Sequence, residues 1–226
     1  MPSSEAISNA KGRKLPRLIF LTGVDGSGKT FFTERLIEEL KKRGLPVRHL
    51  WSRFNNIFSK PLLAFCRLIG INYYVTKNGV RIGYHDFEKS RLISWCFIIC
   101  QLIDLWIVTL IKVWPPIIAG KILVCDRGAY DTLIDVMVDT KNRSLCTSKF
   151  GTAFLMLLPR NHRVFYLRRE PELIYRSRPD VSLDKNFALR WELYQTCAVN
   201  FGWLSIDNNN TIEETMHCIL SYINNL

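Results

Sequence analysis

The sequence lacks the patterns that mark several common protein classes. Its seven cysteines include no C-x-x-C pair and no disulfide-like framework, and its four histidines show no metal-ligand spacing. No internal repeat and no low-complexity tract is visible. These absences argue against a disulfide-stapled fold and against a cysteine–histidine metal site. Seven cysteines, several of them in apolar segments, predict buried free thiols in a reducing cytoplasm.

Composition limits the remaining classes. The chain has 226 residues and is 48% hydrophobic, which suits one α/β domain and excludes a largely disordered protein. Its formal charge of +11 attracts anions, whether nucleic acid, anionic lipid or phosphorylated small molecules. We recognise no nucleic-acid-binding module, so nucleic acid is not an expected partner. Residues 1–16 form a polar, basic leader without the apolar core of a secretory signal, and we expect a flexible arm there.

One long apolar segment complicates the cytoplasmic assignment. Within residues 92–113, only Gln101, Asp104 and Lys112 are strongly polar, and the segment is long enough to cross a bilayer. Ser94, Gln101 and Asp104 share one helical face, however, and an aspartate near the middle of a helix is costly in lipid. We therefore expect a buried helix between the sheet and a partner subunit, with its polar face toward the active site. A membrane span is the less favoured alternative.

Short apolar runs alternate with helical segments along the chain. This alternation predicts an α/β fold with a five-stranded parallel sheet and helices on both faces. The expected strands are residues 17–22, 47–51, 121–125, 163–167 and 203–206. Residues 52–91 form the longest interruption, in which Ser59, Pro61 and Gly70 bracket a short helix and the rest is expected to be loop. A long loop at the ligand-binding edge of a sheet typically covers a substrate.

A glycine-rich motif follows the first expected strand. Residues 23–30 read Gly-Val-Asp-Gly-Ser-Gly-Lys-Thr and match the phosphate-loop pattern G-x-x-x-x-G-K-[ST]. Backbone N–H groups of this motif wrap a polyphosphate, its lysine reaches the outer phosphates, and its threonine helps to hold Mg²⁺. A strand precedes it and a helix follows, as a P-loop NTPase fold requires. The expected ATP-binding residues here are Gly23, Asp25, Gly26, Ser27, Gly28, Lys29 and Thr30.

Charged residues follow the third expected strand. Ligands collect at the carboxyl ends of parallel strands, so residues just after each strand carry the most weight. Asp126 ends an apolar strand in a Walker-B-like arrangement and is expected to hold Mg²⁺ together with Thr30. The neighbouring Arg127 can clamp an acceptor phosphate with two parallel hydrogen bonds.

Four arginines follow the fourth expected strand. Arg168, Arg169, Arg176 and Arg178 are grouped around a helix that opens at Pro171-Glu172. Such a group suits a mobile lid that closes over ATP and stabilises charge on the moving phosphoryl group. Arg176 and Arg178 are the expected lid catalysts because they stand where the helix breaks at Pro179.

In their order along the chain, these motifs resemble thymidylate kinase and its relatives from about residue 17 to the C-terminus. The resemblance implies a single kinase domain over residues 17–226, with an acceptor-side insertion at about 52–91 and a lid at about 170–186. It implies an ATP- and Mg²⁺-dependent kinase that phosphorylates a nucleoside monophosphate such as dTMP and forms a homodimer. Lys29, Arg127, Arg176 and Arg178 would be catalytic, and Asp207 and Asn208 would pack on the donor adenine.

The departures from the family concern the acceptor base. Arg53 is followed by Phe54-Asn55 instead of Glu-Pro, and the family's thymine-contacting arginine is replaced by a segment containing Gln101 and Asp104. The expected acceptor-binding residues are Asp25, Arg53, Phe54, Gln101, Asp104, Arg127 and Asp131. Two alternatives stay open. The same scaffold could phosphorylate a nucleoside, a sugar or another small acceptor, with Asp104, Asp131 and Asp135 binding hydroxyls. The chain could instead be a nucleotide-dependent, membrane-associated binding protein.

Overall fold

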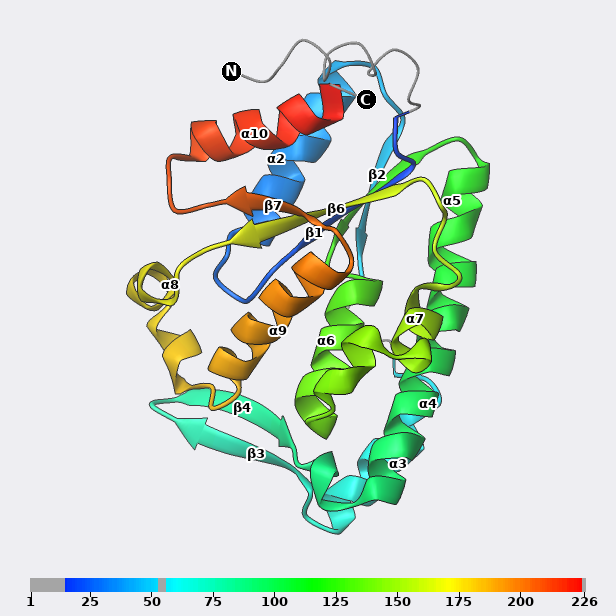
Figure 1. The fold of residues 1–226 in the computed structure, drawn as a ribbon, viewed down its shortest axis with the longest axis vertical. Helices are drawn as coiled ribbons and strands as arrows, with labels where there is room; N and C mark the ends of the chain where they lie inside the picture. The colour runs from blue at the N-terminus through cyan, green and yellow to red at the C-terminus, as the bar shows by residue number, and fades with distance from the viewer. Residues whose placement is uncertain (1–14, 53–55, 225–226) are drawn as a thin grey trace.

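The computed structural model describes residues 15–52 and 56–224. The expected arm at residues 1–16 falls almost wholly outside this part of the chain, as do Arg53 and Phe54. Five parallel strands form one sheet in the order β2-β5-β1-β6-β7 (Figure 1). Their bounds are β1 Leu18–Thr22, β2 Val47–Trp51, β5 Ile122–Asp126, β6 His162–Arg168 and β7 Leu204–Asp207. The α/β class and all five expected strands are confirmed.

The apolar runs form strands because both faces of the sheet are covered. Every residue of β1 is buried, and its side chains alternate between two cores. Ile19 and Leu21 pack in the core beneath α2 (Lys29–Lys42) and α10 (Ile212–Asn224), and Leu18 and Phe20 pack in the core on the opposite face. Each such buried side chain contributes about 1.5–3 kcal/mol relative to exposure.

The second core is built mainly by helices from the middle of the chain. In Figure 1 these helices lie on the side of the sheet away from α2 and α10. Their bounds are α4 Arg91–Val108, α6 Ala129–Thr140, α7 Lys149–Leu155 and α9 Phe187–Asn200, with a 3₁₀ turn η3 at Arg143–Thr147. Helix α6 is buried along its whole length, since it lies between α4 and α9.

The expectation of a loop over most of residues 52–91 was wrong. The short helix is present as α3 (Ser59–Leu68), but an antiparallel hairpin follows it, formed by β3 (Asn72–Lys77) and β4 (Val80–His85). Its turn is Asn78-Gly79, with φ of 49° and 78°. Positive φ at both central residues suits a two-residue hairpin turn, for which Asn-Gly is the strongest short signal. A 3₁₀ turn, η1 (Phe87–Lys89), then leads into α4.

The long apolar segment is one continuous helix at the edge of the molecule. Helix α4 passes through a π-helical turn, η2 (Thr109–Val113), into α5 (Trp114–Ile118). Within the described residues, Arg91–Ile118 is the one helix long and apolar enough to cross a membrane, and its most apolar 18-residue window has a mean hydropathy of 2.1. Half of its most apolar window is buried in the fold. This is weak support for a membrane span, because core helices of soluble proteins can be equally long and apolar.

The hairpin contacts the region expected to form the lid. Helix α8 (Pro171–Ser177) ends before Pro179, as expected, and a 3₁₀ turn, η4 (Pro179–Leu183), follows. Lys185, just beyond η4, reaches the hairpin: its ammonium donates to the Tyr73 hydroxyl (3.0 Å) and to Asp86 (3.2 Å), and its backbone N–H donates to the Tyr84 hydroxyl (3.1 Å). The insertion and the lid region are therefore joined by side-chain contacts.

Candidate functional site

Residues 23–30 curve around a cavity at the carboxyl end of β1. The cavity has a volume of about 400 Å³. We call it the Lys29 cavity, and it is lined by Asp25, Gly26, Gly28, Lys29, Thr30, Phe31, Arg127, Arg169, Ser177 and Arg178. The lining residues come from the first loop, from the turn after β5, and from the segment after β6. Three strand ends thus converge on one site, as expected for a parallel sheet.

Glycine is required at two turns of this loop. Gly23 has φ of 148°, and a Cβ there would lie 2.7 Å from Ser27 Oγ and 2.8 Å from the backbone oxygen of Leu167. Gly26 has φ of 86°, and a Cβ there would lie 2.7 Å from Ile174 Cγ2. The bare backbone therefore lies against its neighbours, and the loop can curve as it does only without side chains at these positions.

Lys29 lies beneath the loop and is 5% exposed. Its Nζ donates hydrogen bonds to the backbone oxygens of Gly23 (2.8 Å) and Val24 (2.7 Å) and lies 3.8 Å from a carboxylate oxygen of Asp25. The ammonium group is thus held at the wall of the cavity. A buried cation with several N–H donors suits the binding of a phosphate chain.

Thr30 and Asp126 form the pair that was predicted to hold a metal. The Thr30 hydroxyl donates to Asp126 Oδ2 at 2.5 Å. Asp126 is 2% exposed, and its other oxygen, Oδ1, is buried and has no hydrogen-bond partner in the described part of the chain. A buried carboxylate oxygen without a partner is unfavourable unless a ligand satisfies it. These residues fit Mg²⁺, which takes one or two protein oxygens and completes its shell with water and phosphate.

The turn after β5 directs Arg127 across the loop. Arg127 has φ of 68°, in the left-handed region that non-glycine residues adopt at a cost of about 1–3 kcal/mol. Its guanidinium forms an ion pair with Asp25 and is 12% exposed. At the next residue, Gly128, a Cβ would lie 2.4 Å from the Phe20 ring. The close packing of this turn on Phe20 holds the strained residue in place.

The structure separates the four arginines of the lid region. Arg178 lines the Lys29 cavity and makes two hydrogen bonds of 2.8 Å to Asp180. Arg169 also lines it and donates to the Gly26 oxygen at 3.1 Å, while its buried Nε has no partner in the described part of the chain. Arg176 is exposed and does not line the cavity, and Arg168 pairs with Glu170.

Sequence reasoning therefore assigned Arg176 to the site and left out Arg169. Arg176 was favoured because it stands where the helix breaks at Pro179, whereas Arg169 had only its position shortly after a strand. What distinguishes Arg169 is the packing of its own backbone, whose oxygen accepts a hydrogen bond from Trp191 Nε1 at 3.1 Å.

Asn208 lies against the loop, whereas Asp207 does not. Asn208 Nδ2 donates to the Ser27 backbone oxygen at 2.7 Å, and its Oδ1 accepts from Thr215. The exposed Asp207 instead caps the N–H of Asn209. Of the pair predicted to bind adenine, Asn208 is thus next to the loop.

Three residues predicted to bind the acceptor lie within the fold. Asp131, Gln101 and Asp104 are each 2% exposed, and none of them lines the Lys29 cavity. Asp131 accepts hydrogen bonds from the Thr22 hydroxyl (2.9 Å), the Gly128 N–H (2.9 Å) and the Tyr194 hydroxyl (2.7 Å).

Gln101 and Asp104 hold the start of α3. Asp104 accepts from the N–H groups of Phe58 (2.7 Å) and Ser59 (3.1 Å) and from the Ser59 hydroxyl (2.5 Å). Gln101 donates to Asn56 (2.7 Å) and to the same hydroxyl (3.0 Å). Asp104 therefore satisfies N–H groups that a helix start leaves open, and Gln101 holds the side chains of Asn56 and Ser59 beside it.

The charges of the Lys29 cavity favour an anion. Four cations, Lys29, Arg127, Arg169 and Arg178, line it, with Asp25 as the one lining carboxylate among the described residues. Burial raises the pKa of the Cys125 thiol, which precedes Asp126, so this cysteine stays protonated and cannot serve as a nucleophile. The arrangement suits the binding of a negatively charged group.

No protein-family model matches the chain, and a search of curated proteins finds no match. The chemistry of the site is therefore inferred from its own residues.

Proposed function

We propose that the chain is a P-loop kinase of the thymidylate kinase-like type, which transfers the γ-phosphoryl group of ATP to a nucleoside monophosphate such as dTMP. The observation that carries this proposal is that Lys29, Thr30 and three arginines line one cavity at the carboxyl end of β1, where Thr30 donates a hydrogen bond to Asp126. Phosphoryl transfer depends on positioning and charge neutralisation, and these residues supply both.

On the donor side, the loop amides and Lys29 would hold the outer phosphates of ATP. Thr30 and Asp126 would hold Mg²⁺, which neutralises phosphate charge when bound. Support for this role comes from the buried Asp126 Oδ1, whose hydrogen-bonding capacity is not used by the described part of the fold. Asn208, next to the loop at Ser27, would border the adenine.

On the acceptor side, Arg127 would clamp the acceptor phosphate, and its partner Asp25 would orient the sugar side. Arg178 would stabilise charge on the moving group, as the sequence motif predicts. Arg169, instead of Arg176, would be the second arginine that stabilises this charge, because it lines the Lys29 cavity and its buried Nε has no partner in the described part of the chain.

The first alternative, a kinase for an unphosphorylated acceptor, assigned hydroxyl binding to Asp104, Asp131 and Asp135. It is less well supported, because Asp104 and Asp131 each make three hydrogen bonds within the fold.

The test is phosphoryl transfer from ATP across a panel of nucleoside monophosphates, extended to nucleosides and sugars. We expect ADP to form with at least one monophosphate, and Lys29→Ala to abolish both this reaction and the retention of ATP. The proposal fails if the purified protein binds no adenine nucleotide, or if Lys29→Ala binds it as the wild type does.

Two matched pairs test the lid assignment. Arg169→Ala and Arg178→Ala should each lower kcat roughly 100-fold or more, as expected for a group that stabilises transition-state charge. Their neighbours outside the cavity, Arg168→Ala and Arg176→Ala, should change kcat little. An equal loss of kcat in Arg169→Ala and Arg168→Ala, or in Arg178→Ala and Arg176→Ala, would contradict the assignment.

A further inference from the structure

The edge of the molecule formed by α3 and the helix Arg91–Ile118 exposes large apolar side chains. Leu68 on α3 is 87% exposed, and on the long helix Leu92, Leu110 and Ile118 are 74%, 53% and 78% exposed. Leu92, Ile99, Ile103 and Leu110 follow at intervals of seven and four residues, so they share one side of the helix. A contiguous row of exposed apolar side chains marks an interaction surface more often than an inert one.

The charged residues of this edge are almost all basic. Lys60 and Arg67 on α3 and Arg91 and Lys112 on the long helix are exposed. Within α3 and Arg91–Ile118 the one acidic residue is Asp104, which is buried and engaged with the start of α3. We call the exposed sides of these two elements the apolar–basic face.

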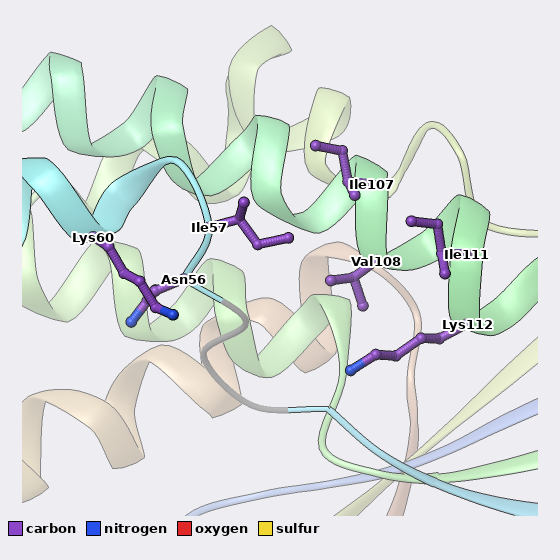
Figure 2. Close-up of a pocket in the computed structure, with 7 residues that line it drawn as sticks. All are labelled: Asn56, Ile57, Lys60, Ile107, Val108, Ile111 and Lys112. Carbon is purple, nitrogen blue, oxygen red and sulfur yellow. The ribbon is translucent and has the colours of Figure 1, made fainter.

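A cavity opens in this face between the start of α3 and the long helix. Its volume is about 420 Å³, and it is lined by Asn56, Ile57, Lys60, Ile107, Val108, Ile111 and Lys112. Figure 2 shows the apolar side chains between Lys60 of α3 and Lys112 of the long helix. Ile57 precedes α3, and the other apolar side chains belong to the long helix. Apolar walls with two cations suit an amphiphile that has a hydrocarbon chain and an anionic head group.

We propose that the apolar–basic face docks the protein peripherally on an anionic phospholipid bilayer. Head-group phosphates meet the lysines and arginines, the exposed leucines and isoleucines enter the boundary of the acyl region, and a hydrocarbon chain occupies the cavity of Figure 2. The inference does not depend on the proposed kinase activity, because it uses none of the residues of the Lys29 cavity.

Charge favours a bilayer over a second copy of the chain. A two-fold symmetric dimer through this face would bring the same basic residues of both copies together, and the face has no exposed acidic residue to offset them. A bilayer with anionic lipids supplies the opposite charge. A span by the long helix is disfavoured because Gln101 and Asp104 on it hold the start of α3, and half of its apolar window packs in the core.

The experiment is co-sedimentation of the full chain, without nucleotide, with two kinds of vesicle. One contains phosphatidylcholine alone, and the other contains phosphatidylcholine and phosphatidylglycerol. We expect binding to the anionic vesicles only, weakened by added salt. The Lys60→Glu/Lys112→Glu variant should lower the bound fraction roughly tenfold or more, and Leu68→Ser/Leu110→Ser should lower it as well.

Matched controls come from other surfaces. Arg35→Glu/Lys41→Glu makes the same charge change on α2, and Val199→Ser removes an apolar side chain of α9 that is 82% exposed. Both should bind as the wild type does, and thermal unfolding should show that all variants fold. Equal losses in the controls would overturn the proposal, since binding would then reflect total charge or total exposed apolar surface.

Three further results would also overturn it. The first is no preference for anionic vesicles. The second is that light scattering detects a dimer, that Leu68→Ser/Leu110→Ser dissociates it, and that the protein does not bind vesicles. This result would mean that the face binds a second copy of the chain. The third is membrane association that resists alkaline extraction, which would indicate a spanning helix.

Discussion

The Lys29 cavity and the α3–α4 junction both contain buried polar groups, but they use them differently. At the α3–α4 junction, Asp104 accepts hydrogen bonds from the backbone of Phe58 and Ser59. Gln101 donates hydrogen bonds to Asn56 and Ser59. At the Lys29 cavity, Arg169 Nε, and Oδ1 of Asp126 behind the lining residue Thr30, are buried and have no partner in the described part of the chain. A buried polar residue therefore indicates a ligand site only when the fold leaves some of its capacity unused.

The same contrast holds for backbone strain. Asn78 and Arg127 both have positive φ, at 49° and 68°. At Asn78 this conformation closes a hairpin, for which the Asn-Gly sequence is suited. Arginine has no such preference, and its conformation aims the guanidinium at Asp25. Arg127 is thus a strained residue at the candidate site, although Lys141, at the end of α6, also has positive φ (52°) and does not line the cavity.

The largest effect that tests this contrast is expected from Asp126→Asn. Loss of the carboxylate should lower Mg²⁺-dependent phosphoryl transfer roughly 100-fold or more while leaving the free energy of unfolding nearly unchanged. Turnover measured across Mg²⁺ concentrations checks this. Asp207→Asn is the matched control, since Asp207 also ends a strand but is exposed and accepts from the Asn209 N–H, whereas Asp126 is buried and accepts from Thr30. A similar loss of turnover in both variants would mean that Asp126 has no specific role in holding Mg²⁺.

Asp131→Ala should have the largest effect on stability. It would leave the Thr22 and Tyr194 hydroxyls and the Gly128 N–H buried without an acceptor, at a cost of about 2–4 kcal/mol in the free energy of unfolding. Urea denaturation measures this cost. If stability is unchanged and the KM for the acceptor rises instead, Asp131 binds the acceptor as the sequence suggested.

Asp104→Ala should have a smaller effect, about 1–3 kcal/mol, because it removes the acceptor at the start of α3. ATP affinity should stay the same, since Asp104 does not line the Lys29 cavity. Denaturation and nucleotide titration of the same variant check both parts. A change in acceptor KM at unchanged stability would place Asp104 in the acceptor site.

The smallest effect concerns Asp86 and pH. Burial acts to raise the pKa of Asp86, but hydrogen bonds from Lys89, Lys185 and Tyr73 outweigh it, and the pKa is lowered from its ordinary value of 3.8. Its stabilising contribution is therefore complete above pH 3.8 and is lost as the pH falls through the lowered pKa. Because Lys185 is 46% exposed, we expect a contribution below about 1 kcal/mol.

Urea denaturation of the wild type and of Asp86→Asn at about pH 5 and about pH 2 measures the Asp86 contribution. The difference in stability between the two proteins should shrink at the lower pH. A difference that grows on acidification would mean that the sign of the shift is wrong.

Local patterns were sufficient for the elements around the Lys29 cavity. The central strands β1 and β5 are apolar almost throughout because both of their faces are buried, whereas the edge strands β2 and β7 are only partly buried. The motif at residues 23–30 curves as expected because glycines permit its backbone conformation. The Asn78-Gly79 turn was equally readable, and the hairpin was missed because its alternating strands were not weighed against the loop expectation.

Which arginines and aspartates reach the candidate site could be decided only from the folded structure. Local patterns favoured Arg176 over Arg169, because Arg176 stands at a helix break, and they assigned ligand roles to both Asp126 and Asp131. Which of them faces a cavity depends on partners distant in sequence, such as Trp191 beside Arg169 and Tyr194 beside Asp131.

The sequence by itself therefore determined the α/β class, the strand order along the chain and the glycine-rich loop with its lysine, because these depend on periodicity and on backbone freedom over a few residues. Only the tertiary structure decided which polar side chains are engaged by the fold and which remain for a ligand. It also decided which side of the apolar helix stays exposed. The reason is physical: hydrogen-bond satisfaction and burial are set by neighbours from distant parts of the chain, which a local pattern does not contain.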